Sequence, residues 1–298
     1  GGTVDRPVTV KDACLVYLHE RQGSIAEGVF RRHVFDDPIA TVKLDKLRRH
    51  HLISWRKRLE AAPALVTRSK HGTPKTKARS PSTINRDMVP LRAALHRVLP
   101  PGAPGTDAAW QEALKPVRGA DRRRELYLDK EQRKSLLSSA DSEILPFLRA
   151  LCHLPLRPGV VAKLQCSNFD VRTRTLTIGR DKNGLSRQLL VSSTIAQFLT
   201  EAQNGKQGEQ PLFSRDDGNS WNKDSWKKPI KLAASQAKLP QETTAYVLRH
   251  SVITDLVRSG LPVLTVAQLS GTSVAMSERH YGHLVRSDAE QALAALEI

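Results

Sequence analysis

The sequence predicts a mainly α-helical protein with a small antiparallel β-sheet, folded as two domains. Apolar residues recur at helical spacing through most of the chain, for example in residues 9–20. Two segments that alternate polar and apolar residues, 171–178 and 187–191, flank an Asn-Gly pair, which is a strong hairpin signal. A polar, basic run at 118–124 is typical of a linker between domains. A chain of 298 residues with 39% hydrophobic residues can supply two ordinary cores.

The charge of the chain predicts a polyanionic partner. Lys and Arg number 47 against 30 Asp and Glu, a net charge of +17. Residues 1–124 hold 25 basic against 12 acidic residues, a net of +13, so the excess lies in the first part. Basic proteins of this size usually meet nucleic acid, and we expect double-stranded DNA; a solvated basic surface is the alternative.

Compartment and cysteine use are consistent with a soluble protein. No apolar run reaches the roughly 18 to 20 residues that cross a bilayer, and no apolar leader is present, so we expect no membrane partner and a cytoplasmic, nucleoid-associated location. The start at Gly1 without a methionine leaves open a further segment before it. Cys14, Cys152 and Cys166 lack metal-ligand spacing and lie among apolar residues, which predicts buried free thiols and no zinc site.

The first part of the chain is expected to be all-helical. Amphipathic patterns predict helices at 9–20, within 41–62, from a cap at Ser82 or Thr83 to Val98, and at 108–114. Residues 66–82 are basic and rich in Gly, Pro, Ser and Thr, which predicts either a loop that orders on DNA or a flexible connector. Trp55 could stack on a base, but a core role is favoured. The candidate DNA contacts are Arg48, Arg49, Arg56, Lys57, Arg68, Lys70, Lys75, Lys77, Arg79 and Arg86.

The most informative stretch is 244–284. Its first helix carries Arg249 and His250 and ends at the helix-breaking Gly-Leu-Pro of residues 260–262. A second helix over about 264–270 ends at a glycine, and a serine can cap a third helix that carries Tyr281. Three packed helices are thus expected to bring Arg249 and Tyr281 together.

These residues resemble the C-terminal motif of the tyrosine recombinase (phage integrase) family, written H-x-L-R-H, then L-G-H, then Y nine residues later. The chain reads Tyr246-Val-Leu-Arg249-His250, then Ser-Gly-Thr272, then Tyr281. Tyr246 and Thr272 stand where many members carry His. The segment Leu-Pro-Leu-Arg157 is similar to the T-G-L-R of the family, and Lys182 to residue 187, KNGLSR, matches the K-x-G-x-x-R of its lysine hairpin.

The resemblance implies a two-domain DNA clamp: a helical core-binding domain at 1–118, a linker at 119–126, and a catalytic domain at 127–298 with a C-terminal tail helix. It implies cleavage and rejoining of DNA through a 3′-phosphotyrosyl link, without metal or cofactor, to integrate or excise a mobile element. It further implies a homotetramer on DNA, accessory DNA-bending proteins and a bacterial or phage source. The implied catalytic residues are Arg157, Lys182, Tyr246, Arg249, Thr272 and Tyr281.

Alternatives remain at this point. Taken alone, Lys182 is a solvated turn residue and Arg157 a surface residue after a helix. The stretch 252–281 also has the look of a helix-turn-helix, which would make the chain a DNA-binding regulator without catalysis. Because Tyr246 and Thr272 are neither cationic nor good bases near neutral pH, a catalytically degenerate recombinase is a second alternative. We expect activity with an altered pH dependence.

Overall fold

The computed structural model describes residues 7–21, 25–66, 73, 75–99, 107–120, 125–179, 186–282 and 284. The chain forms two compact units, residues 1–122 and 123–298. Each unit has a hydrophobic core of its own, so each is described by itself. The predicted class, mainly α with a small antiparallel sheet, is confirmed.

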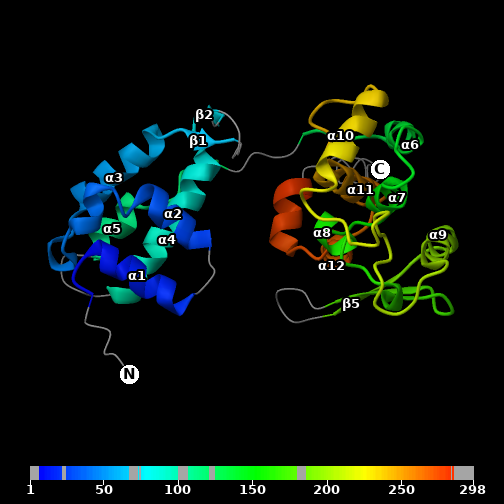
Figure 1. Cartoon of the computed structure of the whole chain (residues 1–298), viewed down its shortest axis with the longest axis horizontal. Helices are drawn as coiled ribbons and strands as arrows, with labels where there is room; N and C mark the ends of the chain where they lie inside the picture. Colours follow the sequence, from blue (N-terminus) through cyan, green and yellow to red (C-terminus); the bar gives the residue numbers. More distant parts are fainter. Residues whose placement is uncertain are drawn as a thin grey trace, which may run out of the picture. The chain divides into compact units, whose positions relative to one another are not determined.

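The first unit is a cluster of helices (Figure 1). Its α-helices are α1 (Val10–Glu20), α2 (Ile25–His33), α3 (Arg49–Ala61), α4 (Pro81–Val98) and α5 (Asp107–Ala113). Helix α4 packs against α1 and α2, and α3 packs against α5. The indole of Trp55 is buried in the core and donates to the backbone oxygen of His33 at 2.5 Å, which confirms the core role. Thr9 caps α1 through the backbone N–H of Asp12.

Three features of this unit differ from the sequence prediction. Helix α2 was not predicted, because it is short and contains Gly28; its buried side chains, Val29 and Phe30 among them, hold it by tertiary packing. The segment predicted as a loop contributes to a two-stranded ladder of β1 (Ala64–Leu65) and β2 (Thr76–Lys77). The cap of α4 is Ser80 rather than Ser82 or Thr83.

The second unit is built around α11 (Ala245–Arg258), which contacts α7, α8 and α12 (Figure 1). Its other helices are α6 (Lys130–Ser138), α7 (Leu145–His153), α8 (Pro158–Val161), α9 (Ser193–Gln203), α10 (Lys227–Gln236) and α12 (Val263–Ser270). Residues 274–282 are also helical. Trp221 and Trp226 stack on Phe147 of α7.

A three-stranded antiparallel sheet lies beside these helices. Its order is β3 (Phe169–Asp170), β4 (Thr175–Ile178) and β5 (Arg187–Leu190). The predicted strand pair is confirmed, with Ile178 opposite Arg187 at the end of the ladder. The strand predicted from residue 171 begins only at Thr175, because residues 171–174 form a turn in which Arg174 has a φ of 52°.

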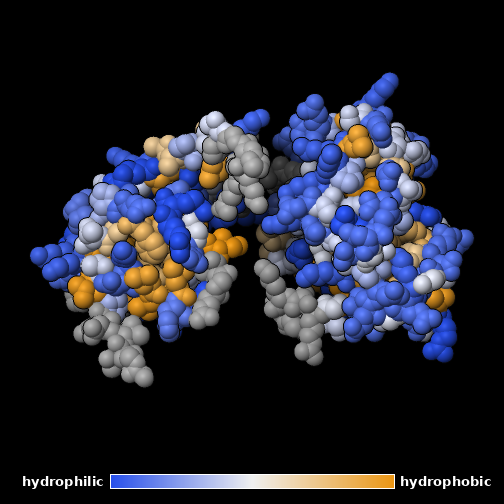
Figure 2. Space-filling view, in the orientation of Figure 1, coloured by the Kyte–Doolittle hydropathy of each residue, from blue (hydrophilic) through white to orange (hydrophobic). Residues whose placement is uncertain are grey.

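The surface differs between the units. Figure 2 shows hydrophobic residues gathered on the drawn face of the first unit, whereas that of the second unit is mostly hydrophilic. Exposed large side chains of the first unit include Leu15, Ile25 and Val89. Within the described ranges, no helix combines the length and apolar character needed to span a membrane. The three cysteines are buried and free, as predicted.

A buried ion pair connects the chain on the two sides of the basic segment, residues 66–82. Arg79 pairs with Asp87 of α4, and the two side chains are 3% and 8% exposed. Arg79 also donates to the backbone oxygen of Ala62 at 2.9 Å. A guanidinium held in this way is not available to a phosphate, so the expectation that Arg79 contacts DNA is corrected by its burial.

We predict that Asp87→Ala destabilises the first unit by about 3–5 kcal/mol, because Arg79 would keep a buried charge without its carboxylate partner. Denaturant unfolding monitored by Trp fluorescence measures the change. Arg86→Ala is the control, since the Arg86 side chain is 72% exposed and should cost less than about 0.5 kcal/mol. Equal stabilities of the two variants would show that the buried pair contributes little.

Candidate active site

Three arginines converge on the last turn of α12. Arg249 donates to the backbone oxygens of Pro155 at 2.6 Å and Ser270 at 3.1 Å. Arg157 donates to the oxygen of Gly271 at 2.5 Å. Arg187 donates to the backbone oxygens of Gln268 at 3.1 Å and Leu269 at 3.2 Å. The four consecutive carbonyls of residues 268–271 therefore hold guanidinium groups from three segments that are distant along the chain.

The sequence explains why these carbonyls are available. The last four carbonyls of a helix have no partner within it and carry its partial negative charge, which favours cations. Gly271 ends α12 in the left-handed region, with φ 66° and ψ 44°. A side chain at this position would also meet the guanidinium of Arg187, which would have to leave its place against the carbonyls of Gln268 and Leu269. Arg187 thus takes part in the site, although the sequence analysis gave it no role.

Burial and like charge shape the electrostatics of the cluster. Arg249 is 8% exposed, and its pKa is lowered to about 10, first by burial and then by the nearby Arg157; Arg187 contributes less. Ionised Tyr281 and Tyr246 act in the opposite direction and raise this pKa. Arg249 therefore remains cationic at neutral pH, close to both tyrosines.

Tyr281 lies on the helical segment 274–282, where Ser273 accepts from the backbone N–H of Met276 at 3.3 Å, as the capping prediction requires. The phenol is 8% exposed and packs against Ile253, Val257 and Val266 of α11 and α12. Its hydroxyl lies 3.1 Å from Nδ1 of His250. The same small core that joins these helices therefore fixes the ring of Tyr281.

The remaining predicted residues occupy different settings. Tyr246 lies on α11 one turn before His250 and is 49% exposed, within electrostatic reach of Arg249. Thr272 directly follows Gly271, and its backbone N–H donates to the oxygen of Ala267 at 3.1 Å. Lys182 lies outside the described residues. The strands on either side of it form the predicted antiparallel pair, and the nearer end of β5 carries Arg187 into the arginine cluster.

A second set of contacts fixes α11 to the start of the unit. The hydroxyl of Tyr127 donates to Asp255 at 2.7 Å, and Arg133 forms an ion pair with the same carboxylate. The backbone N–H of Leu128 donates to Ser251 Oγ at 2.9 Å. These residues carried no motif that the sequence analysis could recognise, yet they hold the helix that bears Arg249.

The predicted DNA contacts of the first unit divide into groups. Arg56 is partly buried and donates to the backbone oxygens of Ala113 and Lys115 at 3.1 and 2.9 Å, so it has a structural role. Arg79 is buried, as described above. Two residues, Arg68 and Lys70, lie outside the described ranges. The exposed members are Arg48, Arg49, Lys57, Lys75, Lys77 and Arg86.

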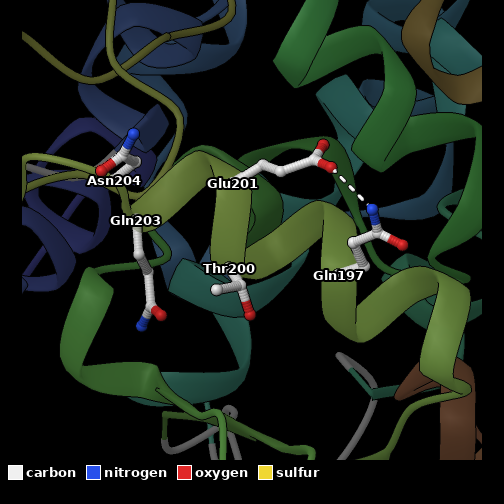
Figure 3. A pocket seen from close by; sticks show the side chains of 5 residues that line it. All are labelled: Gln197, Thr200, Glu201, Gln203 and Asn204. Carbon is white, nitrogen blue, oxygen red and sulfur yellow. Dashed lines mark hydrogen bonds between the residues drawn. The ribbon is translucent and has the colours of Figure 1, made fainter.

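One hollow of the described surface lies elsewhere, along α9 (Figure 3). It has a volume of about 520 Å³ and is lined by Gln197, Thr200, Glu201, Gln203 and Asn204. The hollow is wide open to solvent, and none of the catalytic candidates lines it. Within the described ranges, no three His, Cys, Asp or Glu side chains come together as metal ligands would. The arginine cluster is therefore the better candidate site.

We predict that Gly271→Ala destabilises the second unit more than Gly260→Ala does. Both glycines have positive φ, 66° and 84°, which costs another residue about 1–2 kcal/mol. Only at Gly271 does the new methyl group meet Arg187, while Gly260 faces open space. Thermal unfolding of both variants, alone and combined with Arg187→Ala, measures the difference. If Arg187→Ala leaves the excess cost of Gly271→Ala unchanged, the collision is not its cause.

Comparisons with known proteins agree with this geometry. The model of the phage integrase family matches residues 127–287. No match was found among curated proteins. Among solved structures, the Tn1549 transposon integrase in complex with transposon right end DNA has a TM-score of 0.72 at 16% identity, over 96% of this chain and 99% of that chain. The XerH site-specific recombinase bound to palindromic difH substrate has a TM-score of 0.63 at 15% identity, over 97% and 85%.

At these identities the structural likeness concerns the fold. The family model spans more than half of the chain and includes Arg157, Arg249 and Tyr281, which the structure gathers around one helix end. The chain therefore belongs to the phage integrase family, the tyrosine-type site-specific DNA recombinases.

Proposed function

We propose that this recombinase cuts and rejoins DNA through a 3′-phosphotyrosyl link at Tyr281, in the integration or excision of a mobile element. The observation that carries the proposal is the convergence of Arg157, Arg249 and Tyr281 around the end of α12. Cations close to a phenol provide what phosphodiester cleavage needs: a held phosphate and a nucleophile beside it.

The arginines would bind the scissile phosphate. Each guanidinium has five N–H donors, and the contacts to carbonyls described above use one or two of them in Arg157 and Arg249. The remaining donors can hold nonbridging oxygens and stabilise the charge of a five-coordinate transition state. Lys182 would protonate the departing 5′ oxygen, since an ammonium can act as an acid where a guanidinium does not. Tyr246 and Thr272 would donate hydrogen bonds to phosphate oxygens.

Rejoining would reverse the same step. The phosphotyrosyl link keeps the energy of the broken phosphodiester, so the 5′ hydroxyl of a partner strand can attack it and release Tyr281. The two units would clamp the duplex, with the exposed basic residues of the first unit on the DNA backbone. We further propose a homotetramer on two duplexes, with accessory DNA-bending proteins as partners.

The alternative of a helix-turn-helix regulator has less support. A recognition helix enters the major groove and usually presents basic or amide side chains to it. Helix α12, VLTVAQLS, has no basic residue, carries a single amide side chain at Gln268, and exposes Leu264. Its C-terminal turn is occupied by the three arginines, and α11 is buried along most of its length. This pair of helices is therefore better suited to building a site than to reading a groove.

Covalent trapping tests the proposal. A library of nicked duplexes with a randomised segment releases a short fragment on cleavage, so an adduct cannot reseal. We expect the native chain to give an adduct that is stable in SDS and sensitive to protease, and Tyr281→Phe to give none. Arg157→Ala and Arg249→Lys should each lower the rate of adduct formation by about 10²–10³-fold. An adduct of equal yield from Tyr281→Phe, or none from the native chain across the library, contradicts the proposal.

A salt titration tests the role of the first unit. We expect Lys57→Ala to weaken DNA binding and to lower the slope of log affinity against log salt by about 0.9, because one phosphate contact is lost. Lys115→Ala is the matched control, since that exposed lysine is already paired with Glu112. Fluorescence anisotropy with labelled duplex measures both. Equal slopes for the two variants would remove Lys57 from the DNA interface.

A further inference from the structure

The ring of His250 lies directly on the ring of Tyr281. The ring centroids are 5.4 Å apart with an interplanar angle of 28°, and His250 Nδ1 is 3.1 Å from the phenolic oxygen. His250 is half-buried, and Tyr281 is 8% exposed. The two residues come from different helices, α11 and the segment 274–282, so this contact is a feature of the tertiary fold.

A nucleophilic phenol must lose its proton during attack, and the site needs a group to receive it. Tyr246 does not suit this role, because a phenol is itself a weak acid and not a good base. An imidazole is suited to accept this proton, because its ordinary pKa lies near neutral pH. His280, the neighbour of Tyr281, is a weaker candidate, since its ring centroid is 6.4 Å away and tilted by 58°.

The charged groups around the pair favour ionisation of the phenol. Arg249 from α11, Arg157 at the start of α8 and Arg187 from β5 form the cationic cluster, and Tyr246 and His280 are further titratable neighbours among the described residues. Ionised Tyr281 raises the pKa of Arg249, which means that phenolate and guanidinium attract each other. The phenolate is thus electrostatically supported as it forms.

We propose that His250 is the proton acceptor for Tyr281 during strand cleavage; this role rests on the proposed function. In the tautomer with its hydrogen on Nε2, Nδ1 of neutral His250 accepts the proton as the Tyr281 O–H bond breaks. The phenolic oxygen forms a bond to phosphorus, and the bond from phosphorus to the 5′ oxygen breaks. That oxygen leaves with a proton from Lys182. In the rejoining step His250 returns its proton to Tyr281.

Two variants separate this role from packing. His250→Phe keeps a ring against Tyr281 and removes the nitrogen, whereas His250→Asn keeps a polar atom near the position of Nδ1 without a usable base. We expect both to lower the rate of adduct formation by about 10²–10⁴-fold. The native rate should rise with pH through an imidazole ionisation and then level off, and both variants should lack this limb. Measurements of thermal unfolding and of DNA affinity check that each variant folds and binds DNA.

A substrate with sulfur in place of the 5′ bridging oxygen locates the defect. A thiolate leaves without an added proton, so this substrate should rescue Lys182→Ala. It should not rescue either His250 variant, because their defect lies on the nucleophile. Rescue of both His250 variants would place the residue on the leaving-group side and overturn the role proposed for it.

The remaining outcomes also test the role proposed for His250. A native rate in His250→Phe would mean that ring packing is sufficient, and a native rate in His250→Asn would mean that a hydrogen bond is sufficient; either overturns the proposal while Tyr281→Phe stays inactive. No adduct from the native chain would overturn the proposed function and this role with it. In that case NMR of labelled His250, with and without Tyr281→Phe, would still report whether the hydrogen bond exists in the free protein.

Discussion

The last turn of α12 is the constraint on which the site depends. Three guanidinium groups repel one another, and Arg249 is only 8% exposed to water. Burial first, and then the charge of Arg157, lower the pKa of Arg249. The carbonyls of residues 268–271 offset this cost by direct hydrogen bonds, and the partial negative charge of the helix end adds to them. The fold itself therefore holds the cations in place, and under the proposed function such preorganised donors would stabilise the transition state.

This arrangement brings together segments that lie far apart along the sequence. Arg157 comes from the turn before α8, Arg187 from the first residue of β5, and Arg249 from α11. Each can reach the same helix end only when the second unit is folded, because α7, α8 and α12 all pack on α11. Asp255 and Ser251 add hydrogen bonds from α11 to the start of the unit. Stability and site geometry are therefore properties of one packed unit.

Local signals in the sequence predicted much of this structure. The capping residues Thr9 and Ser273, the glycine at 271 and the strand pair at β4 and β5 lie where local rules place them. The family motif located Arg157, Arg249 and Tyr281. What sequence could not predict depends on tertiary contacts: the short helix α2 and the burial of Arg79 against Asp87. The contact of His250 with Tyr281 belongs to the same group, because no spacing rule relates α11 to the following helices.

The departure at Tyr246 has a structural consequence on α11. Residues 246 and 250 are one helical turn apart, so they lie on the same side of the helix. Tyr246 is 49% exposed, whereas His250 is sheltered against Tyr281. A base must lie within hydrogen-bond reach of the nucleophile whose proton it takes. The imidazole one turn further along α11 meets this condition, with Nδ1 at 3.1 Å from the phenolic oxygen, so a phenol at position 246 does not deprive the helix of a proton acceptor.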